Sequence, residues 1–219
     1  MHINVNNVEL YYKVSGQGSP VLLLHGNSED HGIFKVLSKK LSADHTVYAI
    51  DSRDHGRSSK VHHLNYIDKM NDIAEFIEVL GIEKPILYGF SDGGIIGLLL
   101  AIHHPDVLDK LIISGVNTNP DGLKSFPIFL IKLHYFLTRS NKMKLMLTQP
   151  NITPAELGKI VTPTLVLAGS KDFVKEEHTV ALAKNIPNSE LRILSGETHG
   201  SYVINSKKLY GIIKTFLGE

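Results

Sequence analysis

Apolar residues along this chain form short unbroken runs that alternate with stripes of helical spacing. Unbroken runs are typical of strands buried on both faces, and they predict strands at 21–24, 46–50, 85–88, 108–114, 164–168 and 191–194. Apolar stripes predict helices between and after them, at 33–41, 67–80, 95–101, 174–185 and 209–216. Strands that alternate with helices form right-handed crossovers, so we expect an α/β fold: a mostly parallel β-sheet with helices on both faces.

The N-terminus departs from this alternation. Residues 3–5 and 8–14 alternate between apolar and polar side chains on either side of Asn6-Asn7. Asparagine tolerates the left-handed backbone conformation that a two-residue turn requires. The pattern therefore predicts a β-hairpin at the start of the chain.

A second departure is the segment 117–162, which separates two predicted core strands. It contains four prolines and an aromatic-rich stretch at 126–137. An insertion at the ends of the strands most simply forms a short helical lid over a binding site, and the alternative is an ordinary crossover with additional helices. We therefore expect an α/β core made of 1–116 and 163–219, with 117–162 as the lid.

The strand predicted at 85–88 leads into the most informative motif, Gly89-Phe90-Ser91-Asp92-Gly93. A serine between two glycines, at a turn from strand to helix, has its hydroxyl held out of the sheet plane. The free N–H groups at the start of the following helix point toward negative charge that forms beside that oxygen. Ser91 is therefore a candidate nucleophile, and a glycine-rich turn that merely contains a serine is the alternative.

A serine nucleophile needs a base and a group that orients the base. Histidine suits the first role, because the imidazole pKa lies near working pH. Of the 12 histidines, His199 follows the last predicted strand, and Asp172 follows the strand before it. Because active sites of parallel sheets lie beyond the carboxyl ends of the strands, we expect Ser91, Asp172 and His199 to meet there.

Hydrolysis of an acyl compound also requires donors to the oxyanion. We expect these to be the backbone N–H groups of Asn27, in the loop after the first core strand, and of Asp92, directly after the serine. Both residues are therefore predicted to bind substrate. The Asp92 carboxylate has two further interpretations: it binds an amine of the substrate, or it favours the start of the helix electrostatically.

Taken together, these motifs resemble the α/β-hydrolase superfamily over nearly the whole chain. His25-Gly26-Asn27 matches its oxyanion loop, 51–58 resembles its D-x-R-G-x-G-x-S stretch, and the serine, acid and histidine follow in the family's order. The resemblance implies a serine hydrolase that cleaves a small ester through an acyl-enzyme. Alternatives are the same triad acting on carbon–carbon bonds or peroxide, and a ligand sensor with little turnover. Asp54 replaces the family's usual glycine, which aspartate tolerates.

The composition bears on which partners, metals and cofactors are expected. The chain has 219 residues, 42% of them hydrophobic and 21% charged, with a net charge of +1 and no cysteine. Scattered basic residues indicate neither nucleic acid nor an anionic membrane as a partner. Without cysteine, and without histidines and carboxylates at ligand spacing, we expect no metal and no cofactor. The start of the chain lacks signal-peptide features, so we expect a cytoplasmic protein acting on a small molecule. The oligomeric state stays open.

Overall fold

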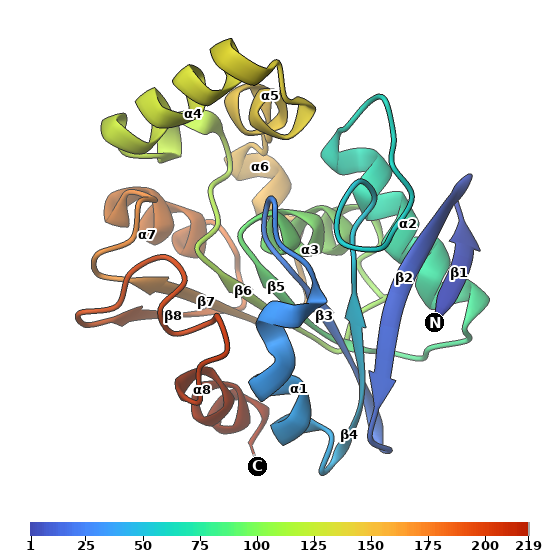
Figure 1. Cartoon of the computed structure of the whole chain (residues 1–219). Helices are drawn as coiled ribbons and strands as arrows, with labels where there is room; N and C mark the ends of the chain where they lie inside the picture. Colours follow the sequence, from blue (N-terminus) through green and yellow to red (C-terminus); the bar gives the residue numbers. More distant parts are fainter. Residues whose placement is uncertain (219) are drawn as a thin grey trace.

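A computed structural model describes residues 1–218 (Figure 1). Its centre is an eight-stranded sheet in the order β1-β2-β4-β3-β5-β6-β7-β8, parallel from β4 to β8 and antiparallel at β1 and β2. The strands are β1 His2–Val5, β2 Val8–Ser15, β3 Ser19–Leu24, β4 His45–Ile50, β5 Ile86–Phe90, β6 Lys110–Ser114, β7 Thr164–Gly169 and β8 Ser189–Leu194. This confirms the predicted mostly parallel α/β fold.

Helices cover both faces of the sheet. One face packs against α2 and α3 in a large apolar core, and the other packs against α1 and α8 in a second core. The helices are η1 His31–Phe34, α1 Lys35–Leu41, α2 Tyr66–Val79, α3 Asp92–His103, η2 Pro120–Gly122, α4 Ser125–Thr138, α5 Asn141–Thr148, α6 Pro154–Leu157, α7 Glu176–Lys184 and α8 Lys208–Leu217. In the described part of the chain, no helix combines the length and apolar character that crossing a bilayer requires.

The predicted hairpin is present. β1 pairs antiparallel with β2, and the turn residues Asn6 and Asn7 have φ angles of 43° and 61°. Both residues lie in the left-handed region that gives a two-residue turn the right twist for a hairpin. Asp54, at the position where the resembling family usually has glycine, also has a positive φ of 63°.

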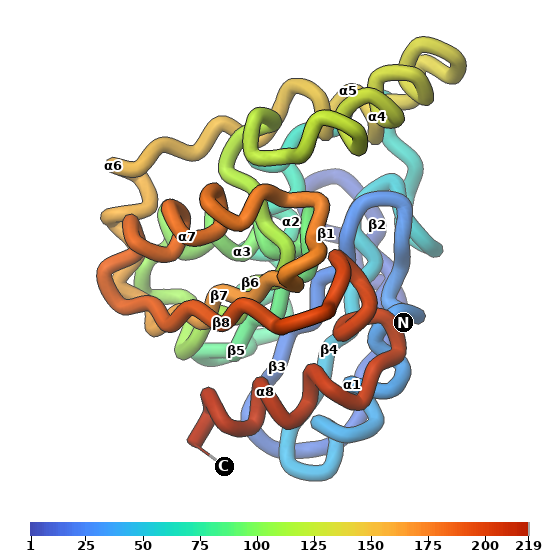
Figure 2. Tube along the Cα trace, turned by 90° about the vertical axis from the view of Figure 1, so that its left-hand side faces the viewer, coloured from blue at the N-terminus to red at the C-terminus, as the bar shows by residue number. Residues whose placement is uncertain are grey.

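The segment 117–162 contains η2, α4, α5 and α6. In Figure 1, α4 and α5 lie at one end of the molecule, and Figure 2 shows the same two helices at its upper edge. Helix α4 packs against α5. The two helices approach the carboxyl ends of the strands, because Ile131 of α4 and Met143 of α5 line the same pocket as Ser91. The position suits a lid, and the division of the chain into core and lid stays a prediction.

Candidate active site

Ser91 occupies a strained corner between β5 and α3. Its φ of 52° and ψ of −114° place a non-glycine residue in a conformation that L-amino acids rarely adopt. The two flanking glycines are required sterically. A Cβ on Gly89 would lie 2.3 Å from the carbonyl oxygen of Gly93, and a Cβ on Gly93 would lie 2.1 Å from that of Leu24. The glycine spacing in the motif is therefore a packing requirement of this turn.

His199 and Asp172 form a hydrogen-bonded pair. The Nδ1 atom of His199 lies 2.8 Å from Oδ1 of Asp172, and that oxygen also accepts a bond from the backbone N–H of Val174 at 3.0 Å. Asp172 is buried, whereas the His199 side chain is 15% exposed. The ring of His199 lies against Phe90 and Phe173, with centroid separations of 4.8 and 3.7 Å. These contacts fix the imidazole and leave Nε2 as the nitrogen available for proton transfer.

Ser91 and His199 line the same cavity, which has a volume of about 430 Å³. Its wall is mostly apolar and comes from the sheet, from the loop after β3 and from α4 and α5; the lining residues are Gly26, Asn27, Ser28, Glu29, Phe90, Ser91, Ile131, His134, Met143, Met146, Phe173 and His199. The Ser91 hydroxyl forms no hydrogen bond within residues 1–218. Its hydroxyl is thus unengaged in a cavity large enough for a small organic molecule.

The two amides predicted to bind an oxyanion are unengaged as well. In the part of the chain that the structure describes, no hydrogen bond comes from the backbone N–H of Asn27 or of Asp92. The neighbouring amide of Gly26 donates to Glu29 Oε2 at 2.9 Å, so it is occupied. Gly26 also packs close to Ser91, since a Cβ there would lie 3.1 Å from that of Ser91.

The Asp92 carboxylate points into a buried polar cluster. Its Oδ1 accepts a bond from the Tyr66 hydroxyl at 2.7 Å, and its Oδ2 accepts bonds from Lys69 Nζ at 3.0 Å and Asn27 Nδ2 at 3.2 Å. Burial raises the pKa of Asp92, but the Lys69 charge and the bonds from Tyr66 and Lys69 outweigh it, so the net pKa is lowered. Asp92 is not among the residues that line the cavity. This geometry does not support an amine-binding role for its carboxylate.

Sequence reasoning missed three residues around the site. Glu29 lines the cavity, and burial raises its pKa. His134 reaches the cavity from α4. Gly115 follows β6 with a φ of 61°, and a Cβ there would lie 2.7 Å from Cε1 of His199. For Gly115, the available signal was a glycine at the end of β6, the strand beside the one that leads into Ser91. Nothing in the sequence marks Glu29 or His134.

The stretch 51–58 has a structural role. Arg53 forms short hydrogen bonds to Asp72 on α2, which ties this loop to the helix. His55 and His25 are buried, and burial lowers their pKa values to about 3 and about 4. His25 is held neutral by its contacts, because Nδ1 donates to the carbonyl of Gly26 and Nε2 accepts from a backbone N–H.

One cluster has the composition of a cation site. Side-chain atoms of Asp30, His31 and Asp51 lie within 4.8 Å of one another. The Asp51 carboxylate, however, already accepts bonds from His31 and from the backbone N–H of Arg57. These bonds explain the cluster without an ion.

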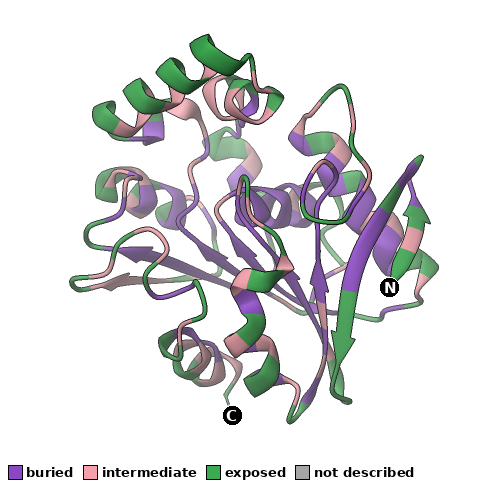
Figure 3. Ribbon diagram, in the orientation of Figure 1, coloured by how far each residue is buried: buried purple, intermediate pink, exposed green. Residues whose placement is uncertain are grey.

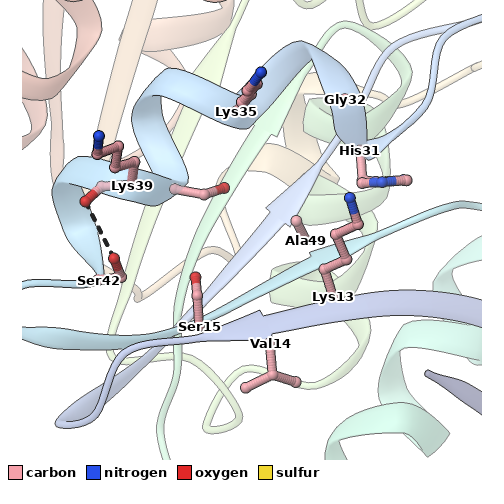
Figure 4. Close-up of a pocket in the computed structure, with 10 residues that line it drawn as sticks. Lys13, Val14, Ser15, His31, Gly32, Lys35, Lys39, Ser42 and Ala49 are labelled. Atoms are coloured by element: carbon pink, nitrogen blue, oxygen red, sulfur yellow. Dashed lines mark hydrogen bonds between the residues drawn. The ribbon is translucent and has the colours of Figure 1, made fainter.

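A second cavity of about 460 Å³ lies between β2 and α1 (Figure 4). Lys13, Lys35 and Lys39 contribute basic side chains to its wall, and none of the predicted site residues lines it. The Ser91 cavity is therefore the one that two of the residues predicted for catalysis, Ser91 and His199, line together, and Asp172 is bonded to His199.

Comparison with known proteins agrees with the architecture. Residues 19–141, more than half of the chain, match the family model for the alpha/beta hydrolase fold. A human serine hydrolase is 25% identical, over 98% of this chain and 85% of its own length. An esterase from Exiguobacterium antarcticum superposes with a TM-score of 0.87 at 20% identity, covering 100% of this chain and 99% of its own. The enol-lactonase of Burkholderia xenovorans gives a TM-score of 0.83 at 17% identity, covering 100% of both chains.

At 20% and 17% identity, the two structural matches establish the fold alone. The two matched proteins are named for different reactions, one as an esterase and the other as an enol-lactonase. The family model adds a match in sequence over 19–141, a range that includes the loop after β3 and the corner at Ser91. A hydrolase relative that aligns with nearly the whole chain points the same way. On this evidence the chain belongs to the alpha/beta hydrolase fold family.

Proposed function

We propose that this protein is a serine hydrolase that cleaves small esters through Ser91, His199 and Asp172. The observation that carries the proposal is the shared cavity: a strained serine and a histidine oriented by a buried carboxylate line one wall. A ring nitrogen that donates to Asp172 leaves the other free to act as a base, as in hydrolases of this type. Distant relatives that are named as hydrolases and esterases add support.

In the proposed mechanism, Nε2 of His199 takes the proton of Ser91 as the serine oxygen attacks the ester carbonyl carbon. Asp172 stabilises the imidazolium, which then gives its proton to the departing alcohol. Water, activated by the same histidine, releases the acid and restores Ser91. The N–H groups of Asn27 and Asp92 stabilise the oxyanion at both stages.

The buried cluster around Asp92 gives this oxyanion site its rigidity. The side chains of Asn27 and Asp92 are hydrogen-bonded to each other at 3.2 Å, so the loop after β3 is tied to the start of α3. The two proposed amide donors belong to these same two residues. Preorganised donors stabilise a developing charge more strongly than mobile ones, because they need no reorganisation during the reaction. The Asp92 carboxylate is therefore a positioning group.

The cavity also suggests the kind of acyl group. A volume of about 430 Å³ with Ile131, Met143 and Met146 in its wall fits an apolar chain of short to medium length. The Glu29 carboxyl in the same wall disfavours an acyl group that carries its own carboxylate, since each of two neighbouring carboxyl groups makes ionisation of the other more costly.

Labelling with a fluorophosphonate, followed by hydrolysis of p-nitrophenyl esters of increasing acyl length, tests the proposal. We expect labelling of the wild type, no labelling of Ser91→Ala, and loss of ester hydrolysis in that variant by at least about 1,000-fold. Ser140→Ala is the matched control, because Ser140 lies outside the cavity. Wild-type turnover in Ser91→Ala would refute the mechanism, and a single burst without turnover would favour the sensor alternative.

A further inference from the structure

Helix α4 is apolar on two opposite faces. Its inner face, with Ile128, Ile131 and Tyr135, is partly covered by the rest of the protein. Its outer face repeats apolar residues at helical spacing and is exposed; it consists of Phe126, Phe129, Leu130, Leu133, Phe136 and Leu137. None of the residues of α4, all of which are described, is buried. The outer face is therefore an apolar surface that the fold leaves uncovered.

The extent of this exposure is unusual. Phe126, Phe136 and Leu137 are 70%, 67% and 70% exposed, although Phe and Leu are among the most frequently buried residue types. Six such side chains on one helix form a contiguous patch, which in a protein that acts alone in water is uncommon. Figure 3 shows α4 mostly in the colour of exposed residues at the outer edge of the molecule. A patch of this kind indicates a binding partner.

The charge around the patch restricts the partner. Between residues 122 and 155 there is no aspartate or glutamate, whereas the segment contains Lys124, Lys132, Arg139, Lys142 and Lys144. Lys132 and Arg139 lie on α4 and at its C-terminus and are exposed, and the Arg139 guanidinium lies 5.6 Å from the ring centre of Phe136. Lys124 and Lys142 are exceptions, because Lys124 Nζ donates to the carbonyl oxygen of Asp172 and Lys142 approaches Asp54. An apolar face bordered by basic groups matches a surface that is apolar inside and negatively charged outside.

We propose that the outer face of α4 docks on an anionic lipid surface. This departs from the sequence expectation of no membrane partner, which considered the scatter of basic residues over the whole chain and not the exposed apolar face that they border on α4. Phenylalanine and leucine side chains would enter the boundary between headgroups and acyl chains, while Lys132 and Arg139 reach the phosphates. A second copy of the chain fits the outer face of α4 less well than a lipid surface does. A twofold contact through α4 would place the basic groups of both copies in one interface, with no acidic partner within 122–155.

The position of α4 connects this surface to the cavity. Ile131, on the inner face of the same helix, lines the cavity that holds Ser91, so the helix would lie between the lipid and the candidate site. Helix α4 spans Ser125–Thr138, which suits a helix lying in the plane of the surface. Docking does not depend on the proposed hydrolysis, and it therefore extends the proposed function without resting on it.

Sedimentation with lipid vesicles tests the proposal. The full-length protein is mixed with vesicles of phosphatidylcholine alone or with phosphatidylglycerol added, at low and high salt. We expect binding to the anionic vesicles to exceed binding to neutral ones at least tenfold, and to weaken as salt is raised. Ser91→Ala should bind as the wild type does, which separates docking from catalysis.

Substitutions locate the contact. Phe129→Ser combined with Phe136→Ser should weaken binding by about tenfold or more, since each ring loses its burial in the lipid. Lys132→Gln and Arg139→Gln should each weaken binding by about fivefold. Val79→Ser is the matched apolar control, because Val79 is also exposed, at 56%, and ends α2, which lies apart from α4 in Figure 1. Far-ultraviolet circular dichroism confirms that each variant is folded.

Two results would overturn the proposal. One is vesicle binding that is equal for the wild type and the double phenylalanine variant. The other is a wild-type protein that ignores vesicles and is dimeric by light scattering, with the double variant monomeric; the face would then be an interface between copies.

Discussion

The ion pair between Lys69 and Asp92 offers the most discriminating test of how this site is held together. Both residues are almost fully buried, at 2% and 3% exposed, and Lys69 Nζ lies 3.0 Å from Asp92 Oδ2. Lys69→Met keeps the length and most of the volume of the side chain but removes its charge. The Asp92 carboxylate then keeps only two neutral donors, Tyr66 and Asn27.

The distance sets the expected size of the effect. At 3.0 Å and an effective dielectric constant of about 20, the attraction between two unit charges is about 5.5 kcal/mol. Breaking one partner of a buried pair is known to destabilise proteins by about 3–5 kcal/mol, because a buried charge is left uncompensated. We therefore expect Lys69→Met to lower the free energy of unfolding by about 3–5 kcal/mol at neutral pH.

Urea denaturation followed by circular dichroism measures this change. A second substitution supplies the internal check: in Lys69→Met combined with Asp92→Asn, no charge remains to be compensated, so most of the lost stability should return. Lys184→Met is the control for removal of an exposed lysine and should change stability by less than about 0.5 kcal/mol.

The pH dependence of Lys69→Met provides a second check. Without the lysine, burial raises the pKa of Asp92 above its unfolded value. The folded variant then takes up a proton more readily than the unfolded one, so the deficit relative to wild type should shrink as pH falls from 8 to 5. A loss below about 1 kcal/mol, or a double variant no more stable than the single one, would refute the argument.

Three further predictions concern titration, steric fit and catalysis. Burial lowers the pKa values of His25 and His55 to about 4 and about 3, so below pH 6.5 the unfolded chain binds more protons than the folded one. The free energy of unfolding of the wild type should therefore fall by up to about 2.7 kcal/mol per pH unit toward pH 4, and urea denaturation that shows no change with pH would contradict this. Gly93→Ala should lower the melting temperature sharply, because its Cβ would lie 2.1 Å from a backbone oxygen. Gly211→Ala in α8 should instead stabilise the protein by roughly 0.5–1 kcal/mol, since no atom lies within 4 Å of its Cβ; a similar effect of both substitutions would refute the steric argument. If the proposed mechanism holds, Asp172→Asn should lower kcat on a p-nitrophenyl ester about 10,000-fold with little change in stability, and a loss below tenfold would remove Asp172 from the mechanism.

Local sequence determined the features that depend on neighbours along the chain. Asn6-Asn7 predicted the hairpin because its turn needs two residues that tolerate a positive φ. The spacing Gly89-x-Ser91-x-Gly93 predicted the sharp corner because only glycine fits at the two positions that flank it. The alternation of strands and helices predicted the parallel sheet, and parallel strands bring their carboxyl ends to one edge. The pairing of His199 with Asp172, at 2.8 Å, follows from that topology.

Tertiary structure alone decided which charges are buried and which apolar faces are left open. Nothing in the sequence connects Lys69 with Asp92, whose carboxylate was expected to bind an amine or to favour the start of a helix, and only the packing of α2 against α3 makes them a buried pair. The segment 117–162 was expected to form a helical lid, but the aromatic-rich stretch at 126–137 could not indicate which of its side chains the protein covers. Periodicity records where apolar side chains lie around a helix axis, whereas burial depends on what is packed against each side. The exposed face of α4 is therefore a property of the folded chain.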